Sequence, residues 1–333
     1  MASIMTNASA LTALQSLNAT QKNLDTTQAR ISTGYRVSQA SDNAAYWSIA
    51  TTMRSDNQAM STVSDALGLG ASKVDTAYTG MSSAIDTINQ IQQKLTASYG
   101  QTDASKEKTQ TEIKALQDQL KAYADGATFS GTNMLSVNSG TATAAADVKI
   151  VSAFNRDATG AVSISTIDVN VESIKLYEAG TTAGTVKGIL DADRIGSTGA
   201  ITATAANPTL GNAAVAGTDT YSVAGLKIFD SATGKGASDS QIAEMMNVVD
   251  TALKAMTTAA TKLGAAKSSI DLQKTFTSSL MDSIDRGVGQ LVDADMNKES
   301  TRLQALQVQQ QLGVQALSIA NSSSQSILSL FRG

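Results

Sequence analysis

The sequence predicts a mainly α-helical protein that carries a β-rich insert in the middle of the chain. Its 333 residues include a single proline, which permits long uninterrupted helices. In the N-terminal and C-terminal thirds, apolar residues recur about every 3.5 positions, the period of paired helices. Between about residues 139 and 237 the chain is rich in Gly, Ala and Thr, and its apolar residues alternate with a period of two.

The first helix is expected from about residue 10 to Gly34. Its apolar seam advances in alternating steps of four and three, with two polar interruptions: Ala10, Leu14, Leu17, Gln21, Leu24, Gln28 and Ile31. This stepping is typical of a helix that pairs with another helix along one narrow face. Gly34 is expected to end it, because glycine readily adopts the left-handed conformation that closes many helices.

A second and longer helix is predicted between residue 60 and Gly100. Its seam contains Met60, Val63, Leu67, Gly70, Val74, Ala77, Met81, Ala84, Ile88, Ile91 and Leu95. At a rise of 1.5 Å per residue, this helix is expected to be about 50 Å long. A shorter helix follows with Ile113, Leu116, Leu120 and Tyr123 in register, and residues 126–135 predict a hairpin with two glycines.

The C-terminal third mirrors this arrangement. One helical seam runs from Ile242 to Ile284, and Gly287 and Gly289 are expected to separate it from a last helix that runs from Val292 to Phe331. In the insert, strands are expected at residues 148–154, 161–167 and 221–228, separated by turns. Because neither terminal stripe can be buried alone, the two ends of the chain are expected to pair.

Composition excludes most enzyme classes. The chain has no His and no Cys, which excludes zinc sites built on them, Ser-His-Asp and Cys-His catalysis, and disulfides. A net charge of -4 and the lack of a Lys/Arg block argue against nucleic acid as a partner. No apolar run reaches 18 residues, and the N-terminus lacks the pattern of a cleavable signal. Neither a cofactor nor a metal is expected, since Asp293 and Asp295 favour a capping or interface role over a cation site.

The terminal helices predict self-assembly. Apolar residues also lie outside their seams: Leu11, Val308, Leu312, Val314, Ile319, Leu328 and Leu330. Burying one such side chain contributes about 1.5–3 kcal/mol, so a helix that is apolar on several sides favours neighbours on several sides. We expect those neighbours to be further copies of the chain. The alternative is an intramolecular bundle with ordinary exposed leucines.

Three segments resemble the signatures of bacterial flagellins. Residues 31–50 read ISTGYRVSQASDNAAYWSIA, residues 291–300 read LVDADMNKES and residues 327–332 read ILSLFR. The resemblance covers residues 1–140 and 238–333 with its motifs in the family order, and it is most similar to flagellins of rhizobia and other alphaproteobacteria. It implies a non-enzymatic subunit of the extracellular flagellar filament, active in swimming motility.

The family's layered plan divides the chain into three parts. Residues 1–42 and 290–333 are expected to form the inner coiled-coil domain (D0), residues 43–138 and 238–289 the surrounding helical domain with its hairpin (D1), and residues 139–237 the variable β-rich outer domain (D2). The resemblance further implies export in an unfolded state through the flagellar type III apparatus, with a secretion chaperone. Other flagellin copies, sister flagellins, and the hook-associated and cap proteins are the implied partners.

Two groups of site residues follow from this plan. Expected at the subunit interface are Leu14, Leu17, Leu24, Ile31, Leu303, Leu306, Leu317 and Ile327. The signature segment between D0 and D1 contributes the second group of site residues: Arg36, Asp42, Asn43 and Trp47. Two alternatives remain open for Arg30, Arg36 and Arg54: each forms a bridge to a neighbouring subunit, or each lies on a solvated face. Two also remain open for Trp47, which lies either in a contact between subunits or in the core.

A third segment aligns with the region that Toll-like receptor 5 recognises in enteric flagellins. Ile91 and Gln93 stand at the arginine positions of that region, Lys94 stands at the glutamate, and Leu95 follows. The charges are missing, so weak or no recognition is expected.

Three alternatives to a filament subunit are disfavoured. A hook–filament junction protein belongs to the same family, but the C-terminal signature disfavours it. An enzyme carried on the insert and a membrane-surface protein are disfavoured as well.

Overall fold

The computed structural model describes residues 7–139, 145–157, 159–180, 187–203, 205–206, 208–215 and 217–330, with side chains up to residue 322. The chain divides into two compact units. Unit 1 comprises Met1–Ala59 and Ser279–Gly333, and unit 2 comprises Met60–Ser278. Both units are built largely from helices, and the insert belongs to unit 2.

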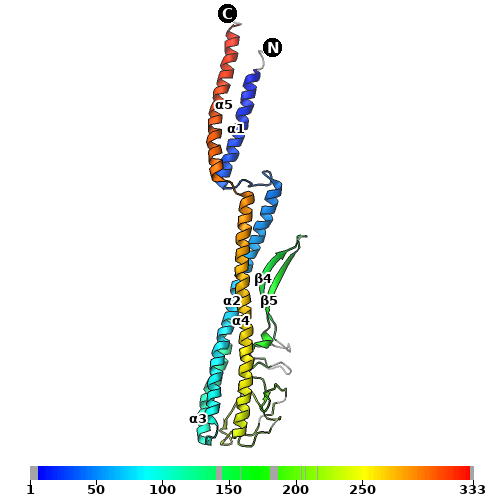
Figure 1. Cartoon of the computed structure of the whole chain (residues 1–333), viewed down its shortest axis with the longest axis vertical. Helices are drawn as coiled ribbons and strands as arrows, with labels where there is room; N and C mark the ends of the chain where they lie inside the picture. Colours follow the sequence, from blue (N-terminus) through cyan, green and yellow to red (C-terminus); the bar gives the residue numbers. More distant parts are fainter. Residues whose placement is uncertain are drawn as a thin grey trace. The chain divides into compact units, whose positions relative to one another are not determined.

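The described elements are five α-helices and a set of mostly short strands (Figure 1). The helices are α1 (Ala8–Thr33), α2 (Ala44–Ser98), α3 (Asp103–Gly126), α4 (Asp239–Val292) and α5 (Met296–Leu330). The strands are β1 (Thr128–Phe129), β2 (Thr132–Asn133), β3 (Ser136–Val137), β4 (Val148–Arg156), β5 (Val162–Val169), β6 (Tyr177–Glu178), β7 (Arg194–Ile195), β8 (Thr220–Tyr221), β9 (Phe229–Asp230) and β10 (Lys235–Gly236), with a 3-10 turn η1 (Val171–Ser173).

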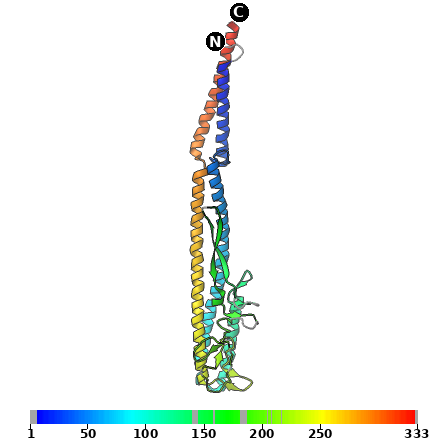
Figure 2. The same ribbon diagram turned by 90° about the vertical axis from the view of Figure 1, so that its right-hand side faces the viewer.

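In unit 1, α1 and α5 lie side by side, as both views show (Figures 1 and 2). Asn7 caps the start of α1 by accepting a hydrogen bond from the Ala10 N–H at 3.1 Å. Gly34 ends the helix with a φ of 76°, the left-handed conformation. The predicted pairing of the chain ends is thus confirmed for these two helices.

One predicted boundary is wrong. Helix α4 continues through Gly287 and Gly289 and ends at Val292. A glycine inside a helix costs about 1 kcal/mol but does not stop it when neighbouring residues are well packed. Here Val288 and Val292 are buried with Val37 and Ala50, which holds the last turns of α4 in place.

The turn between α4 and α5 comes at residues 293–295 instead. The Asp295 carboxylate accepts hydrogen bonds from the N–H groups of Asn297 and Lys298 at 3.0 and 3.2 Å, so it caps the start of α5. The capping role predicted for this acidic pair is therefore observed at Asp295.

Helix α2 also differs from its prediction, because it begins at Ala44, well before residue 60.

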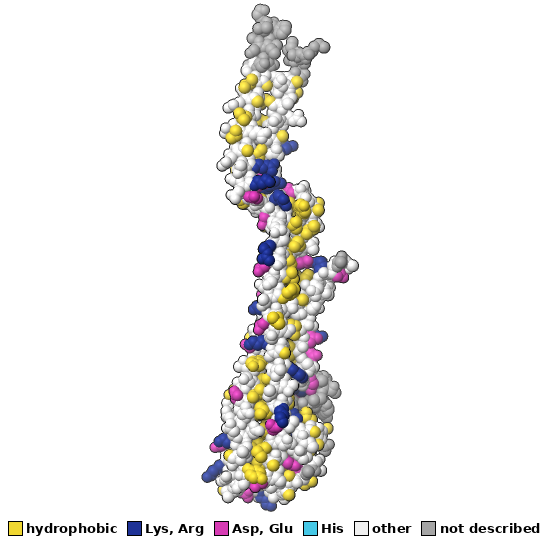
Figure 3. Space-filling model, viewed as in Figure 1, with side chains coloured by type: hydrophobic (Ala, Val, Ile, Leu, Met, Phe, Trp, Pro, Cys, Tyr) yellow, Lys and Arg dark blue, Asp and Glu magenta, His cyan; other side chains and the backbone are white. Residues whose placement is uncertain are grey.

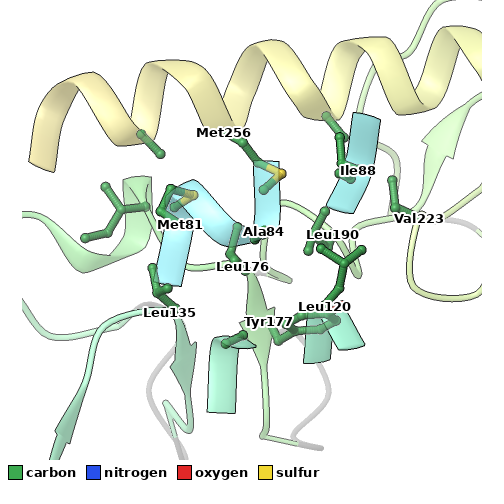
Figure 4. Close-up of a cluster of buried hydrophobic side chains, with 14 of the residues drawn as sticks. Met81, Ala84, Ile88, Leu120, Leu135, Leu176, Tyr177, Leu190, Val223 and Met256 are labelled. Atoms are coloured by element: carbon green, nitrogen blue, oxygen red, sulfur yellow. The ribbon is translucent and has the colours of Figure 1, made fainter. Parts of the chain in front are cut away.

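The core of unit 2 lies between α2, α3, α4 and segments of the insert. Figure 4 shows side chains from each of these elements pointing toward one another. They include Met81, Ala84 and Ile88 of α2, Leu120 of α3, Met256 of α4, and Leu135, Leu176, Tyr177, Leu190 and Val223 from the chain between α3 and α4. The predicted seams of α2 and α4 are therefore core positions, and the insert shares that core.

Two hairpins match the predictions for residues 126–135 and 148–167. In the first, β1 pairs with β2 through a turn in which Ser130 and Gly131 both have positive φ. In the second, β4 and β5 pair antiparallel (Figure 2).

The strand predicted at residues 221–228 is wrong, since only Thr220–Tyr221 is extended and paired there. Val223, Leu226 and Ile228 of this stretch are nevertheless buried, so they fill the core without a ladder.

None of the described helices combines the length and the apolar character that a membrane-spanning segment requires.

Candidate subunit interface

The contact between α1 and α5 joins small, apolar and polar side chains. A Cβ placed on Gly313 of α5 would lie 3.2 Å from Leu17 Cδ1 of α1, so glycine allows the two helices to approach closely. The polar interruption at Gln21 has a partner, because Gln310 Nε2 donates to Gln21 Oε1 at 2.7 Å. Polar residues in a helical seam are tolerated when they pair, and they fix the register of the two helices.

The eight residues expected at the interface have different environments within the single chain. Leu24 and Leu306 are buried. Leu17, Ile31, Leu303 and Leu317 are half-buried. Leu14 is 44% exposed, and the side chain of Ile327 lies outside the described residues. Pairing α1 with α5 thus buries only part of the predicted seam.

Several large apolar side chains of the two helices are exposed, and Figure 3 shows such side chains on the visible face of this region. They are Leu11, Leu14, Val308, Leu312, Val314 and Ile319, with exposed fractions between 44% and 68%. Leu328 and Leu330, predicted to belong to the same set, lie outside the described side chains. Single exposed leucines are ordinary, whereas a large contiguous apolar patch is typical of an interaction site.

The signature loop between α1 and α2 is held against the end of α4. The backbone N–H groups of Arg36 and Val37 both donate to the Val292 carbonyl, and Arg36 Nη2 donates to the Leu291 carbonyl at 2.9 Å. Asp42 closes the loop by accepting from the N–H groups of Ser38 and Gln39. These backbone hydrogen bonds hold the pKa of the Asp42 carboxyl below its ordinary value.

Asn43 of the signature has a specific structural role. Its Oδ1 accepts a hydrogen bond from the Tyr46 N–H at 3.1 Å, so it caps the start of α2. Asn is among the residues preferred directly before a helix, because its side-chain oxygen accepts from an N–H of the first turn. Trp47, on the first turn of α2, is 39% exposed, which rules out the core position for it within the single chain.

The three arginines of this region have partners within the chain. Arg30 pairs with Glu299 of α5 at 3.2 Å. Arg36 lies 5.9 Å from the centre of the Tyr46 ring, and Arg54 lies 4.9 Å from that of Tyr35. Arg36 and Arg54 are exposed, which agrees with the solvated position left open for them, and the bridge to a neighbouring subunit stays a prediction.

The segment that resembles the receptor-recognised region lies on α2 in unit 2. Ile91 and Leu95 are fully buried in the core, whereas Gln93 is exposed. Lys94 pairs with Glu112 of α3 at 2.6 Å. Of the four residues, only Gln93 and Lys94 therefore present surface to a partner.

A buried ionic cluster in the insert was not predicted. Lys175 is fully buried and lies 3.0 Å from Glu172 and 2.9 Å from Glu178. Burial alone would raise the pKa of Glu178, but the ammonium of Lys175 and the donors of Ser139 and Gly180 lower it to about 2. The spacing Glu-x-x-Lys-x-x-Glu was the available signal, although such a pattern ordinarily indicates a solvated surface.

Comparison with known proteins places these features in a family. Residues 4–140 match the bacterial flagellin N-terminal helical region, and residues 246–331 match the bacterial flagellin C-terminal helical region. Flagellin C of Rhizobium meliloti (strain 1021) is 48% identical over 333 residues, which cover 100% of both chains. Flagellin of Brucella melitensis biotype 1 is 47% identical over 334 residues, and flagellin A of Rhizobium meliloti (strain 1021) is 42% identical over 404 residues, both with full coverage of both chains.

These matches agree with the helical ends, the central insert and the signature loop described above. They favour a filament subunit over a hook–filament junction protein, because these three relatives match over their full length and are flagellins. The chain therefore belongs to the bacterial flagellin family, and it is a structural subunit of the extracellular flagellar filament that polymerises with other flagellin copies.

Proposed function

We propose that the exposed apolar faces of α1 and α5 are the surfaces through which copies of this chain join in the filament. The single observation that carries this proposal is the row of exposed apolar side chains along α5, from Val308 to Ile319. Burying each of them contributes about 1.5–3 kcal/mol, which is available only in an assembly. The repeated contact does not have to close on itself, so it generates a helical polymer.

Assembly and folding of the terminal helices are coupled in this proposal. Fixing the backbone of one residue costs about 1–2 kcal/mol, and α1 with α5 has few fully buried side chains to offset that cost. In the free subunit these helices are therefore expected to be largely disordered. They order when a neighbouring copy covers their exposed faces, as in other coupled folding and binding reactions.

Several partners complete the proposal. Membership of the family supports export of the unfolded chain through the flagellar type III apparatus, with a chaperone that holds the C-terminal helix. It also supports contacts with the hook-associated and cap proteins at the filament ends, and with sister flagellins along the filament. Recognition by Toll-like receptor 5 is expected to be weak or absent, since Ile91 is buried and the aligned charges are missing.

The experiment compares three variants on α5. Leu306 is buried against α1, so Leu306→Asp disrupts pairing within the chain. Leu312 is 58% exposed, so Leu312→Asp leaves that pairing intact and places a charge on the proposed interface. Leu312→Met is the matched control, because it keeps an apolar side chain of similar volume. Purified subunits are mixed with short filament seeds, and growth is followed by electron microscopy and circular dichroism.

Leu312→Met is expected to polymerise with a rise in helicity, and both Asp variants are expected to remain monomeric. Normal filaments from Leu312→Asp would show that this face of α5 is not an interface. Wild-type subunits whose terminal helices are already formed before assembly would contradict the coupling between folding and assembly.

A further inference from the structure

Two pairs of large apolar side chains are exposed on unit 2. Val162 and Ile164 of β5 are 51% and 64% exposed, and Leu272 and Phe276 of α4 are 70% and 59% exposed. Residues two apart on a strand, or four apart on a helix, point to the same side, so each pair forms one apolar patch. We call them the hairpin patch and the α4 patch. The other large apolar side chains exposed in the described part of unit 2 stand singly along the chain: Leu69, Tyr78, Tyr99, Ile201 and Val215.

The hairpin patch lies on the side of the β4–β5 hairpin that faces away from α2. On the opposite side, Ile150 is buried against Gly70 of α2, and its ladder partner is Ile167. Successive side chains of a strand alternate between its two faces, so Val162 and Ile164 project from the face that Ile167 does not share. Figure 1 shows the end of the hairpin standing away from the helices of unit 2. The hairpin patch is therefore a projecting apolar knob.

Arg156 places a positive charge at the hairpin patch. It is exposed and lies directly opposite Val162 in the β4–β5 ladder, and residues opposite each other in a ladder share a face of the sheet. Its guanidinium carbon lies 5.9 Å from the centre of the Phe154 ring, and Phe154 is the ladder partner of Ile164. The knob is thus apolar along its length and positively charged at its end.

The α4 patch borders a shallow hollow of about 340 Å³. The hollow is lined by Gly264, Lys267, Ser268, Asp271, Leu272 and Thr275. Three of these residues have small side chains, which leaves room for side chains from outside. Lys267 forms an ion pair with Asp75 of α2, so the other charge on the rim is the exposed carboxylate of Asp271. The hollow therefore complements the knob in shape, in apolar character and in the sign of its charge.

We propose that the hairpin patch of one copy docks on the α4 patch of a neighbouring copy in the filament, with Arg156 beside Asp271. Both patches are exposed in the single chain, so they do not cover each other there. The chain polymerises with other flagellin copies, and a contact between two different patches of the same chain repeats from copy to copy without closing. This contact lies in unit 2, so it adds to the one proposed for α1 and α5 and does not replace it.

The chain has no cysteine, which allows a direct test by disulfide cross-linking. Full-length subunits with Ile164→Cys and with Leu272→Cys are mixed in equal amounts, grown on filament seeds, checked by electron microscopy and oxidised. Each subunit carries one thiol, so every disulfide joins two copies. Dimers that a reducing agent removes are expected from the mixture and not from either variant by itself, because the contact joins two different patches. The double variant is expected to give a ladder of longer oligomers, since each copy then carries both halves of the contact.

Ile201→Cys is the matched control for Ile164→Cys. Ile201 also lies on the insert and is 64% exposed, as Ile164 is, but it belongs to neither patch. Its mixture with Leu272→Cys is expected to give far fewer dimers than the mixture with Ile164→Cys. Equal yields from the two mixtures would overturn the proposal. Dimers that form equally well from Ile164→Cys by itself would also overturn it, because they would show that hairpins contact one another.

A charge exchange tests the same contact without cysteines. Arg156→Asp and Asp271→Arg each place two like charges at the contact, so each is expected to raise the subunit concentration needed for seeded growth severalfold. The combined variant restores opposite charges and is expected to return this concentration toward the wild-type value. A combined variant that grows no better than the single variants would contradict the pairing of Arg156 with Asp271. Both tests leave α1 and α5 unchanged, so their outcome is separate from that of Leu312→Asp.

Discussion

Arg30 Nη1 lies 3.2 Å from Glu299 Oε1, and this ion pair joins the last turn of α1 to the first turn of α5. The Glu299 side chain is 9% exposed and that of Arg30 is 26% exposed, so the carboxylate is almost buried and the guanidinium is partly open to solvent. The pair therefore links α1 and α5 at the ends that adjoin the loops following α1 and preceding α5.

The contribution of this pair is expected to lie between the values for exposed and buried pairs. Exposed pairs contribute about 0–1 kcal/mol, and breaking a buried pair costs about 3–5 kcal/mol. A double-mutant cycle of Arg30→Gln and Glu299→Gln is therefore expected to give a coupling energy of about 1–2 kcal/mol in the thermal dissociation of filaments. Additive effects of the two changes would show that the pair is not formed in the assembled state.

Two glycines on α2 provide a matched test of helix–hairpin packing. A Cβ on Gly70 would lie 2.3 Å from Ile150 Cγ2 of β4, whereas a Cβ on Gly68 meets no atom within 4 Å. Gly68→Ala is expected to stabilise the subunit by up to about 1 kcal/mol, because alanine favours the helix. Gly70→Ala is expected to destabilise it by about 1–3 kcal/mol, because the β4–β5 hairpin must move.

Urea unfolding of the monomer measures both changes. Adding Ile150→Ala to Gly70→Ala is expected to restore part of the loss, since it removes the clashing methyl group. If the two single glycine variants prove equally stable, the hairpin does not pack on α2 at this point.

The Lys175 cluster predicts an acid-labile insert. The pKa of Glu178 is about 2 in the folded chain and has an ordinary value of 4.5. A lowered pKa stabilises the fold fully above the unfolded value, and this stabilisation is lost as the pH falls from about 4.5 toward 2. At neutral pH it amounts to roughly 3 kcal/mol at most.

Glu178→Gln is expected to lower the melting temperature at neutral pH and to flatten the loss of stability between about pH 4.5 and pH 2. Calorimetry across this range, with the exposed pair variant Asp118→Asn as the control, measures both effects. An unchanged acid profile in Glu178→Gln would assign the acid lability to other carboxylates.

The cap on α2 can be tested by conservative changes at one residue. Asn43→Ala removes the acceptor of the Tyr46 N–H and is expected to cost about 0.5–2 kcal/mol. Asn43→Asp keeps the acceptor and adds a negative charge near the helix N-terminus, so it is expected to be at least as stable as the wild type. Unfolding followed by the fluorescence of Trp47, the single tryptophan, reports on this turn directly.

The helices were predictable because their apolar periods extend over many turns. The seams of α1, α2 and α4 continue long enough that a wrong assignment would expose a whole stripe of side chains. The helix boundaries were less predictable, since Gly287 and Gly289 carry a local breaking signal that buried Val288 and Val292 override. The strand expected at residues 221–228 failed for a related reason: its apolar residues enter the core without a neighbouring strand.

By itself, the sequence determined the helical class, the central insert, the pairing of α1 with α5 and the family, because periodicity and contiguous motifs are local properties of the chain. Only the tertiary structure decided that Arg30 pairs with Glu299 and that Lys175 is buried between two glutamates. Each of these relationships joins residues whose environment depends on which helix face or loop is packed against them. A charge in the sequence carries no sign of its burial, and burial determines both its pKa and its contribution to stability.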